Sequence, residues 1–287
     1  DLIQSHLLGT NVYCSLEGLL TGKPVITTFH GAVDISDKER FMVIKFGLIN
    51  RGASKIITVS QSLRDQILRK TSFKKMKTDV IHNGIDTTDF ERQKSNELWQ
   101  LFGWSQGDII VGSLGNVRPA KGYDVLLRAA AKLAQSKGRF RFVIAGQGKS
   151  NELYKELLEL KKNLGLQGQV EFLGFVDDPA CFLSNLDLYL LPSISEGFSI
   201  STIQAMASGI PVIVTRSGGP EEIVTHQENG WIVDQGKPAA IVHGLEFLGA
   251  HPEVCANLSN NAKEKVVNVF SMDAMLEKYE KTYSEFC

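Results

Sequence analysis

Residues 190–224 constrain the fold more than any other part of the chain. The apolar run Leu186–Leu191 is typical of a fully buried parallel strand. A helix is predicted from near Ser199, because apolar residues recur after it at spacings of three and four, and Gly209 ends it. Pro211–Thr215 is predicted as the next buried strand. The stretch therefore predicts a strand–helix–strand unit of a parallel sheet.

Two strand-to-helix turns follow these strands at one edge of the predicted sheet. The first, 193–198, places the carboxylate of Glu196 beside Gly197, and the second, 217–220, contains a Gly-Gly pair before Pro220. Such turns direct backbone N–H groups and positive helix ends into one crevice. The pattern predicts an anion site suited to a phosphate-bearing ligand, although two ordinary connecting loops give the same pattern.

Strands and helices alternate along the first 83 residues, which predicts a parallel sheet covered by helices. The strands are expected at Asp1–Ser5, Pro24–Phe29, Lys55–Ser60 and Asp79–His82. The helices are expected at Thr10–Leu20, Ser36–Asn50 and Gln61–Lys70. Four strands make only about half of a Rossmann-like domain, and the chain begins without Met in what reads as the middle of a domain. We therefore expect an N-terminal domain that lacks its first part.

A turn at Asn83–Asp86 is taken as the domain boundary. The strands that follow are expected at Ile109–Leu114, Arg141–Ala145, Val170–Leu173, Leu186–Leu191, Pro211–Thr215 and Trp231–Val233. The helices are expected at Ser95–Phe102, Tyr123–Gln135, Asn151–Leu164, Thr202–Ala207, Pro238–Leu248, Pro252–Val269 and, capped by Ser271, Ser271–Phe286. The expected organisation is a partial domain at 1–83, a complete domain at 84–270 and a C-terminal helix at 271–287.

Composition narrows the class of protein. The 287 residues are 43% hydrophobic and 22% charged, which is usual for a globular chain with room for two domains. A net charge of −1 gives no field that would recruit nucleic acid, so no nucleic-acid partner is expected. The four cysteines lie far apart, which indicates neither a zinc site nor a disulfide framework. No apolar run reaches the roughly 18 residues of a membrane span, so we expect a cytoplasmic protein.

Six motifs occur in an order and spacing that point to one family. They are His82–Asp86, Gly115–Gly122, Ile144–Gly148, Glu196–Phe198, Gln204–Val212 and Ser217–Val224. Together they resemble retaining glycosyltransferases of family 4, over most of the chain. The resemblance implies the GT-B fold of two Rossmann-like doubly wound domains. It also implies an enzyme that moves a sugar from a nucleoside-diphosphate sugar to a hydroxyl acceptor. In that family the domain at 1–83 would lie on the acceptor side, the domain at 84–270 would bind the donor, and the helix at 271–287 would pack back on the N-terminal domain.

Arg118 and Lys121 follow the first strand of the second domain, and Lys121 is expected to begin the helix that comes next. A diphosphate leaving group gains negative charge as the glycosidic bond breaks, and two cations beside it stabilise the transition state more than the ground state. The family usually places its arginine at the position of Asn116, and Arg118 is taken as the substitute. Two solvated charges at a turn are the alternative.

Glu196 resembles the family carboxylate that accepts hydrogen bonds from the donor sugar. We expect it to be buried and therefore to need partners. A carboxylate that only complements the positive N-terminal end of the following helix is the alternative. Gln204 stands where the family usually has a glutamate that binds the ribose hydroxyls. An amide accepts hydrogen bonds more weakly than a carboxylate, so weaker nucleotide binding is expected and not a dead site. A degenerate, non-catalytic homologue is the alternative.

His30, at the end of the strand Pro24–Phe29, resembles the histidine of a T-x-H-G motif that faces the donor sugar in the family. An imidazole can hydrogen-bond a sugar hydroxyl or a phosphate there. A histidine satisfied by the local backbone is the alternative. His6 holds a similar place at the end of the first expected strand.

The predicted catalytic set is Arg118, Lys121, Glu196 and His30. The predicted donor-binding set is Gly115, Asn116, Gly146, Gly148, Ser193, Gly197, Phe198, Ser199, Ile200, Gln204, Gly218 and Gly219. The pair Gly146 and Gly148 gives G-x-G without a third glycine, which is a weak dinucleotide signature and argues against a dehydrogenase. The chain has no D-x-D motif, so metal independence is predicted, with no cofactor besides the nucleotide-sugar substrate.

The partners remain open at several points. The acceptor is expected to be a glycan or a lipid-linked glycan. Residues 69–77 hold five cations with Phe73 and Met76, which fits either a solvated loop or peripheral contact with an anionic inner membrane face. The alternatives to a transferase are a sugar-nucleotide epimerase or phosphorylase on the same fold, and a non-catalytic nucleotide-sugar-binding homologue.

Overall fold

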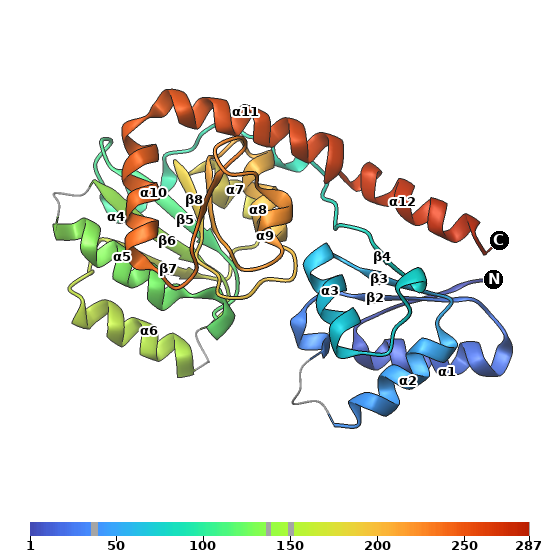
Figure 1. Cartoon of the computed structure of the whole chain (residues 1–287). Helices are drawn as coiled ribbons and strands as arrows, with labels where there is room; N and C mark the ends of the chain where they lie inside the picture. Colours follow the sequence, from blue (N-terminus) through green and yellow to red (C-terminus); the bar gives the residue numbers. More distant parts are fainter. Residues whose placement is uncertain (36–39, 136–138, 149–151, 287) are drawn as a thin grey trace. The chain divides into compact units, whose positions relative to one another are not determined.

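The computed structural model describes residues 1–35, 40–135, 139–148 and 152–286 (Figure 1). The chain forms two compact units, each with its own parallel sheet. The first unit comprises Asp1–Gly84, Glu196–Phe198 and Val269–Cys287. The second unit comprises Ile85–Ser195 and Ser199–Asn268.

The first unit contains a four-stranded sheet in the order β1-β2-β3-β4, with all strands parallel. Its strands are β1 (Ile3–His6), β2 (Val25–Phe29), β3 (Lys55–Thr58) and β4 (Thr78–Val80). Its α-helices are α1 (Leu8–Thr21), α2 (Met42–Gly52), α3 (Gln61–Lys70) and α12 (Met272–Ser284). Short 3₁₀ helices are η1 (Ala32–Ile35) and η2 (Lys75–Lys77). A parallel sheet whose strands follow one another in sequence order is the outcome expected from a β-α alternation.

Helices α1 and α12 cover opposite faces of this sheet. A Cβ at Gly18 of α1 would lie 2.5 Å from Val25 of β2. The next residue, Ile26, joins Tyr279 of α12 in a buried cluster. Because successive side chains of a strand point to opposite faces, the two helices lie on the two sides of β2, as Figure 1 also shows.

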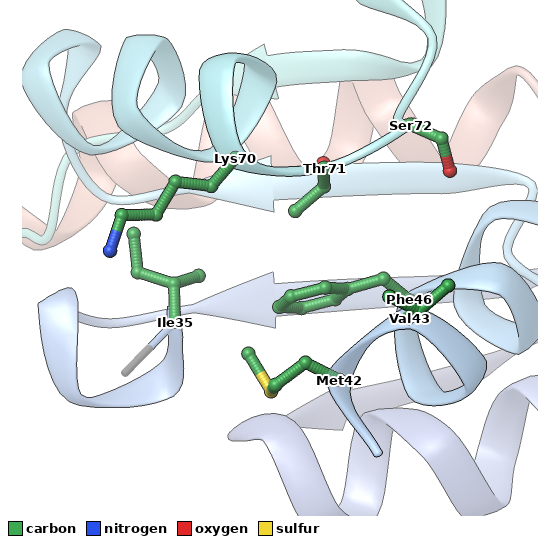
Figure 2. Close-up of a pocket in the computed structure, with 7 residues that line it drawn as sticks. All are labelled: Ile35, Met42, Val43, Phe46, Lys70, Thr71 and Ser72. Carbon is green, nitrogen blue, oxygen red and sulfur yellow. The ribbon is translucent and has the colours of Figure 1, made fainter. Parts of the chain in front are cut away.

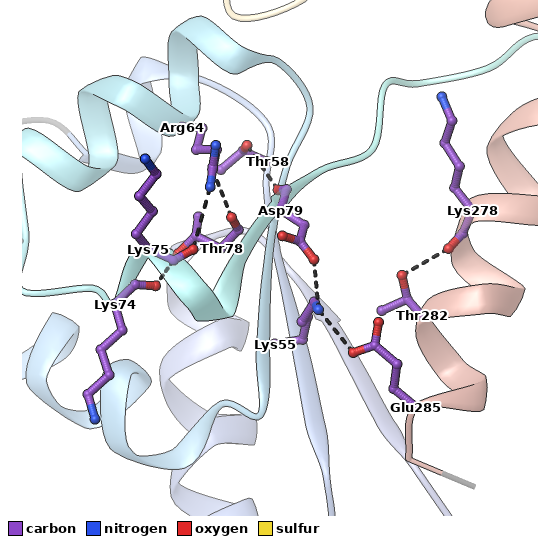
Figure 3. Close-up of polar contacts among 10 residues, drawn as sticks. All are labelled: Lys55, Thr58, Arg64, Lys74, Lys75, Thr78, Asp79, Lys278, Thr282 and Glu285. Atoms are coloured by element: carbon purple, nitrogen blue, oxygen red, sulfur yellow. Dashed lines mark hydrogen bonds and ion pairs between the residues drawn. The ribbon is translucent and has the colours of Figure 1, made fainter.

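A polar contact fastens α12 to β3 and β4 (Figure 3). The ammonium of Lys55 lies 2.7 Å from Asp79 Oδ2 and 3.0 Å from Glu285 Oε2. The Lys55 side chain is only 12% exposed, whereas each carboxylate is 48% exposed. The C-terminal end of the chain is thus ion-paired to the sheet of the first unit.

The second unit contains a six-stranded parallel sheet in the order β10-β9-β8-β5-β6-β7. Its strands are β5 (Ile109–Leu114), β6 (Phe140–Ala145), β7 (Val170–Gly174), β8 (Leu188–Leu191), β9 (Val212–Thr215) and β10 (Trp231–Val233). Its α-helices are α4 (Glu97–Phe102), α5 (Tyr123–Gln135), α6 (Glu152–Asn163), α7 (Pro179–Ser184), α8 (Ile200–Ala207), α9 (Pro220–Ile223), α10 (Pro238–Ala250) and α11 (Pro252–Val269). Two 3₁₀ helices are η3 (Thr88–Phe90) and η4 (Pro119–Lys121). The α/β class expected from the sequence is confirmed.

Helices pack on both faces of this sheet. Leu188 and Leu190 of β8 join the buried residues of α5, α6 and α10 in the main hydrophobic core. Tyr189 points to the other face, where its hydroxyl donates a hydrogen bond of 2.7 Å to Ser201 of α8. The sheet is therefore covered on both sides, which explains why its strands read as continuous apolar runs.

Several elements differ from the sequence predictions. Helix α2 begins at Met42, with Phe41 in a left-handed conformation before it, so the predicted start at Ser36 is wrong within the described part, and residues 36–39 lie outside the described residues. Lys121 ends η4 and does not begin α5. Helix α7 was not predicted, because its six residues are too short to show helical periodicity.

Candidate active site

The strand order of the second unit reverses between β5 and β8. Strands β6 and β7 lie to one side of β5, and β9 and β10 lie beyond β8. The connections that leave the carboxyl ends of β5 and β8 therefore diverge, and ligands of open parallel sheets bind at such a point. The loops after these two strands hold most of the predicted donor-binding residues.

Lys121 lies directly over Gly115, the first residue after β5. A Cβ at residue 115 would stand 2.9 Å from Cε and 3.2 Å from Nζ of Lys121. The hydroxyl of Tyr123 donates to the carbonyl of Gly115 at 2.7 Å and holds this turn from the start of α5. The glycine thus gives the ammonium its place at the carboxyl end of a central strand.

Arg118 lies exposed on the same loop, immediately before η4. Lys121 N–H donates to the carbonyl of Arg118 at 3.0 Å, which closes the turn between the two cations. The Lys121 side chain is partly buried. The loop therefore presents one exposed and one partly buried positive charge within four residues.

Asn116, Gly146 and Gly148 join the loops after β5 and β6. The side-chain oxygen of Asn116 accepts a hydrogen bond from Gln147 N–H at 3.0 Å. A Cβ at Gly146 would lie 2.0 Å from the carbonyl of Gly115, and one at Gly148 would lie 2.6 Å from Val117. These residues have a clear packing role, because only glycines allow the two loops to approach this closely.

The loop after β8 is tied to the loop after β5. Ile194 N–H donates to the carbonyl of Ala120 at 2.7 Å. Ser193 is fully buried, and its carbonyl accepts a hydrogen bond from the hydroxyl of Thr215 at the end of β9. The ends of β5, β8 and β9 are thus joined into one supported edge.

Helix α8 begins beside this edge. Ser199 is its N-cap, and the Ser199 hydroxyl accepts from Thr202 N–H at 3.3 Å and from the Thr202 hydroxyl at 2.8 Å. Ile200 is 44% exposed and Gln204 is partly buried. No hydrogen bond to the side-chain amide of Gln204 is found among the described residues. Its amide can therefore still accept from a ligand hydroxyl.

The Gly218–Gly219 turn differs from the prediction of an open anion site. Helix α9 has only four residues. The carboxylate of Glu221 accepts from Ser217 N–H at 3.2 Å and from Gly218 N–H at 2.9 Å. Two of the backbone donors expected to face a phosphate are thus already bound by the protein's own carboxylate.

Four of the predicted site residues belong to the first unit. They are His30, Glu196, Gly197 and Phe198. Phe198 is buried and stacks on His82, with ring centroids 5.4 Å apart. Glu196 is partly exposed, so the expectation of a buried carboxylate is wrong.

His30 contacts two groups that the sequence did not single out with it. Its Nε2 lies 2.9 Å from Nδ1 of His6, and its backbone N–H donates to Asp34 Oδ2 at 2.9 Å. Burial lowers the pKa of His30, and the nearby His6 lowers it further, while the charge of Asp34 opposes both. A Thr-x-His-Gly pattern gave His30, but nothing in the sequence paired it with Asp34, because η1 brings that carboxylate back to β2.

A cavity of about 180 Å³ opens on the first unit (Figure 2). Ile35, Met42 and Phe46 form its apolar wall, and Lys70, Thr71 and Ser72 form the facing polar side. Figure 2 shows the Lys70 side chain reaching toward Ile35. The cavity thus combines an apolar wall with a cation.

The described residues contain no group of three or more His, Cys, Asp or Glu side chains arranged to hold a metal ion. Among the helices of the described part of the chain, none has both the length and the apolar character needed to cross a bilayer.

Comparison with solved structures defines the fold class. HepE of Anabaena, solved with UDP and glucose, has a TM-score of 0.90 at 24% identity, over 99% of this chain and 78% of that one. Sucrose-phosphate synthase of Thermosynechococcus elongatus has a TM-score of 0.85 at 20% identity, over 99% of this chain and 73% of that one. The fold is the GT-B fold of glycosyltransferases, as predicted.

Family models then identify the chain. The family described as Glycosyl transferases group 1 matches residues 96–265, and that described as Glycosyltransferase Family 4 matches residues 1–89. The protein belongs to the group 1 glycosyltransferases, and the predicted membership of family 4 is consistent with both matches.

Curated relatives agree with this family. The N-acetyl-alpha-D-glucosaminyl L-malate synthase of Bacillus anthracis is 28% identical over 99% of this chain and 74% of its own length. The capsular polysaccharide biosynthesis glycosyltransferase CapM of Staphylococcus aureus is 28% identical over 82% of this chain and 62% of its own length. An uncharacterized glycosyltransferase of Methanocaldococcus jannaschii is 30% identical over 79% of this chain and 59% of its own length. The chain thus spans about three fifths to three quarters of these relatives.

Proposed function

We propose that the protein transfers a sugar from a nucleoside-diphosphate sugar to a hydroxyl acceptor, with retention and without a metal ion. The bond from the anomeric carbon to the diphosphate oxygen breaks, and its electron pair leaves with the diphosphate. The acceptor oxygen forms the new bond to that carbon and gives up its proton. The observation that carries the proposal is the ammonium of Lys121 above Gly115, at the switch point of the second sheet.

Arg118 and Lys121 are proposed to stabilise the diphosphate. Negative charge grows on the leaving group in the transition state, so fixed cations lower the barrier more than they tighten ground-state binding. HepE, whose fold this chain shares, is solved with UDP and with UDP-glucose. This supports a nucleoside diphosphate as the ligand of the edge formed by β5, β8 and β9.

A thermal-shift titration with UDP, GDP, ADP and CDP tests the donor site. A ligand at 100 times its Kd adds about 2.7 kcal/mol of stability. We expect one diphosphate to raise the unfolding midpoint of the wild type and to lose most of that effect in Arg118→Ala and Lys121→Met. Arg128→Ala, an exposed cation further along α5, is the matched control. Equal stabilisation of Lys121→Met and wild type would reject the proposed role.

The reaction itself is tested with the sugar nucleotide of the base that binds. Release of the nucleoside diphosphate with a sugar–acceptor product supports the transferase, and the anomeric configuration of the product, read by NMR, tests retention. Turnover that is unchanged by chelators supports metal independence. An epimerised sugar nucleotide, or cleavage that requires phosphate, would instead identify an epimerase or a phosphorylase.

A non-catalytic nucleotide-sugar-binding protein is the second candidate. Two observations favour it: Gln204 in place of the usual glutamate, and the Glu221 carboxylate on the N–H groups of Ser217 and Gly218. Such a protein would bind the nucleoside diphosphate in the titration and yet release none from any sugar nucleotide.

A lipid-linked glycan at the inner membrane face is proposed as the acceptor. The cavity of the first unit offers an apolar wall that includes Val43. Val43 and its neighbours Phe41 and Ile44 are 62–88% exposed. Exposed cations follow at Lys70, Lys74 and Lys75. Each cation adds about 1 kcal/mol of attraction near an anionic bilayer.

Sedimentation with phosphatidylcholine vesicles, with and without phosphatidylglycerol, tests this acceptor side. We expect binding that requires phosphatidylglycerol, falls with added salt, and is lost in the double variant Lys74→Glu with Lys75→Glu. The exposed pair Lys155→Glu with Lys162→Glu on α6 is the control. Absence of sedimentation with anionic vesicles would leave a soluble glycan as the acceptor.

A further inference from the structure

Two histidines meet at the carboxyl ends of neighbouring strands of the first unit. His6 is the last residue of β1, and His30 directly follows β2. Nδ1 of His6 lies 2.9 Å from Nε2 of His30, and the two rings are stacked with their centroids 5.2 Å apart. A contact this short between two ring nitrogens holds one proton, so one nitrogen donates and the other accepts.

The direction of this hydrogen bond follows from the group on the far side of His6. The side-chain nitrogen of Gln4 lies 3.3 Å from Nε2 of His6. The Gln4 side-chain oxygen, in turn, accepts a hydrogen bond from the hydroxyl of Tyr283 on α12. An amide nitrogen only donates, so Nε2 of His6 is the acceptor and the His6 proton is on Nδ1.

The proton position on His6 also determines the proton position on neutral His30. Nδ1–H of His6 must donate to Nε2 of His30, which places the proton of neutral His30 on its own Nδ1. No hydrogen bond to Nδ1 of His30 is found among the described residues. The donor of His30 is therefore available to a ligand.

The backbone around the pair is fixed by one buried carboxylate and one strained residue. Asp34, 8% exposed, accepts from His30 N–H through Oδ2 and from Leu8 N–H, 3.4 Å away, through Oδ1. Leu7, between His6 and α1, has φ 69° and ψ 152°, a conformation that only glycine adopts readily.

We propose that Tyr283, Gln4 and His6 form a relay that holds His30 neutral with its proton on Nδ1, so that His30 donates a hydrogen bond to an oxygen of the ligand. His6 is a positioning residue, because it acts through His30. The titratable groups that act on His30 are His6 from β1 and Asp34 from η1, and burial and His6 both lower its pKa. The identity of the ligand oxygen, a sugar hydroxyl or a phosphate oxygen, rests on the proposed function, whereas the protonation of His30 does not.

Long-range ¹H–¹⁵N spectra of the histidine rings test the relay directly. In the wild type we expect His30 to show a protonated Nδ1 and an unprotonated Nε2. In His6→Ala and Gln4→Leu, the hydrogen bonds no longer favour one tautomer of neutral His30. A mixture of the tautomer protonated on Nδ1 and the tautomer protonated on Nε2 is therefore expected. His6→Asn keeps an N–H near the position of Nδ1 and restores the wild-type pattern. His243, exposed on α10, is the internal reference and does not change.

A wild-type His30 that carries its proton on Nε2 would overturn the inference, and so would a His6→Ala spectrum identical to that of the wild type. Circular dichroism of each variant shows whether it is folded. The Gln4→Leu variant keeps the test decisive if His6→Ala fails to fold, since the described contacts link Gln4 to His30 through His6.

The pH profile of turnover, with the sugar nucleotide that the thermal titration identifies, tests the ligand contact. We expect His6→Ala to lower kcat by about tenfold, the loss of one hydrogen bond, and to move its acid limb to higher pH. His6→Asn is expected to recover the wild-type profile. Spectra as expected with unchanged turnover in His6→Ala would reject the ligand contact. Absence of turnover in the wild type would reject the proposed function, and the spectra would still decide the relay.

Discussion

The side chain of Lys121 lies against the α-carbon of Gly115, so that a Cβ added at residue 115 would stand 2.9 Å from its Cε. Both residues belong to the loop that leaves β5 at the switch point of the second sheet. Glycine at position 115 therefore leaves the space that the Lys121 side chain occupies.

Gly115→Ala tests this relationship. The added methyl group meets the far end of a flexible side chain, so we expect the ammonium to move away at a cost in stability of less than about 1 kcal/mol. Transfer activity is expected to fall by about tenfold or more, because the cation no longer meets the leaving group. Turnover measures the loss of activity, and the midpoint of urea unfolding measures the change in stability. Gly107→Ala, where the new methyl group meets no atom within 4 Å, is the control, and equal turnover in the two variants would contradict the prediction.

Leu7→Gly is expected to stabilise the protein. The φ of 69° and ψ of 152° at Leu7 cost about 1–3 kcal/mol for a residue with a side chain. Relief of this strain stabilises the folded state. Glycine also gives the unfolded chain greater conformational entropy, which offsets roughly 0.5–1 kcal/mol of the relief. We expect a net rise of about 1 kcal/mol in the free energy of unfolding, measured in urea.

The same substitution further along α1 gives the control. Leu16 is 43% exposed within the helix, so Leu16→Gly should destabilise by about 1 kcal/mol. Loss of stability in both variants would show that Leu7 is not strained.

Gln204→Glu is expected to tighten binding of the nucleoside diphosphate. A carboxylate accepts from ribose hydroxyls more strongly than an amide does, by on the order of 1 kcal/mol, which is about fivefold in Kd. Calorimetric titration measures this Kd, and Gln204→Leu is the variant expected to weaken binding. Weaker binding in Gln204→Glu would place the side chain beside the phosphates instead of the ribose.

The ion pairs of Lys55 predict a loss of stability at alkaline pH. Burial, the largest single influence, lowers the pKa of Lys55, but the hydrogen bonds and charges of Asp79 and Glu285 together outweigh it and raise the pKa. The folded pKa is therefore above the unfolded value of about 10.4. The contribution is fully present below the unfolded pKa and is lost as the pH rises through the folded one.

Lys55→Met isolates this contribution. We expect the free energy of unfolding of the wild type to exceed that of the variant by about 1 kcal/mol at pH ~8. This difference is expected to shrink above pH ~10.5. Lys23→Met, which removes an exposed pair with Asp1 at 3.7 Å, should show little difference at either pH. A pH-independent difference for Lys55→Met would contradict the ion-pair account.

The sequence predicted most of the elements that frame the site. Continuous apolar runs predicted β5 and β8, and apolar spacings of three and four predicted α5 and α8, all to within about two residues. The six motifs led to the family that the comparisons confirm. The sequence-based prediction was wrong where hydrogen bonds of polar side chains decide the local structure. The Gly218–Gly219 turn was expected to offer free N–H groups, but Glu221 folds back onto them, and no periodicity records which way a carboxylate turns.

The amino-acid sequence by itself determined the α/β class, the family and the positions of Arg118 and Lys121, because these depend on local pattern and motif order. Only the tertiary structure decided that Gly115 seats Lys121, that Lys55 pairs with Glu285, and that Gln4 and His6 lie in line with His30. Each of these contacts joins residues brought together by strand register and helix packing, and their geometry at the scale of a hydrogen bond does not exist until the sheet has formed.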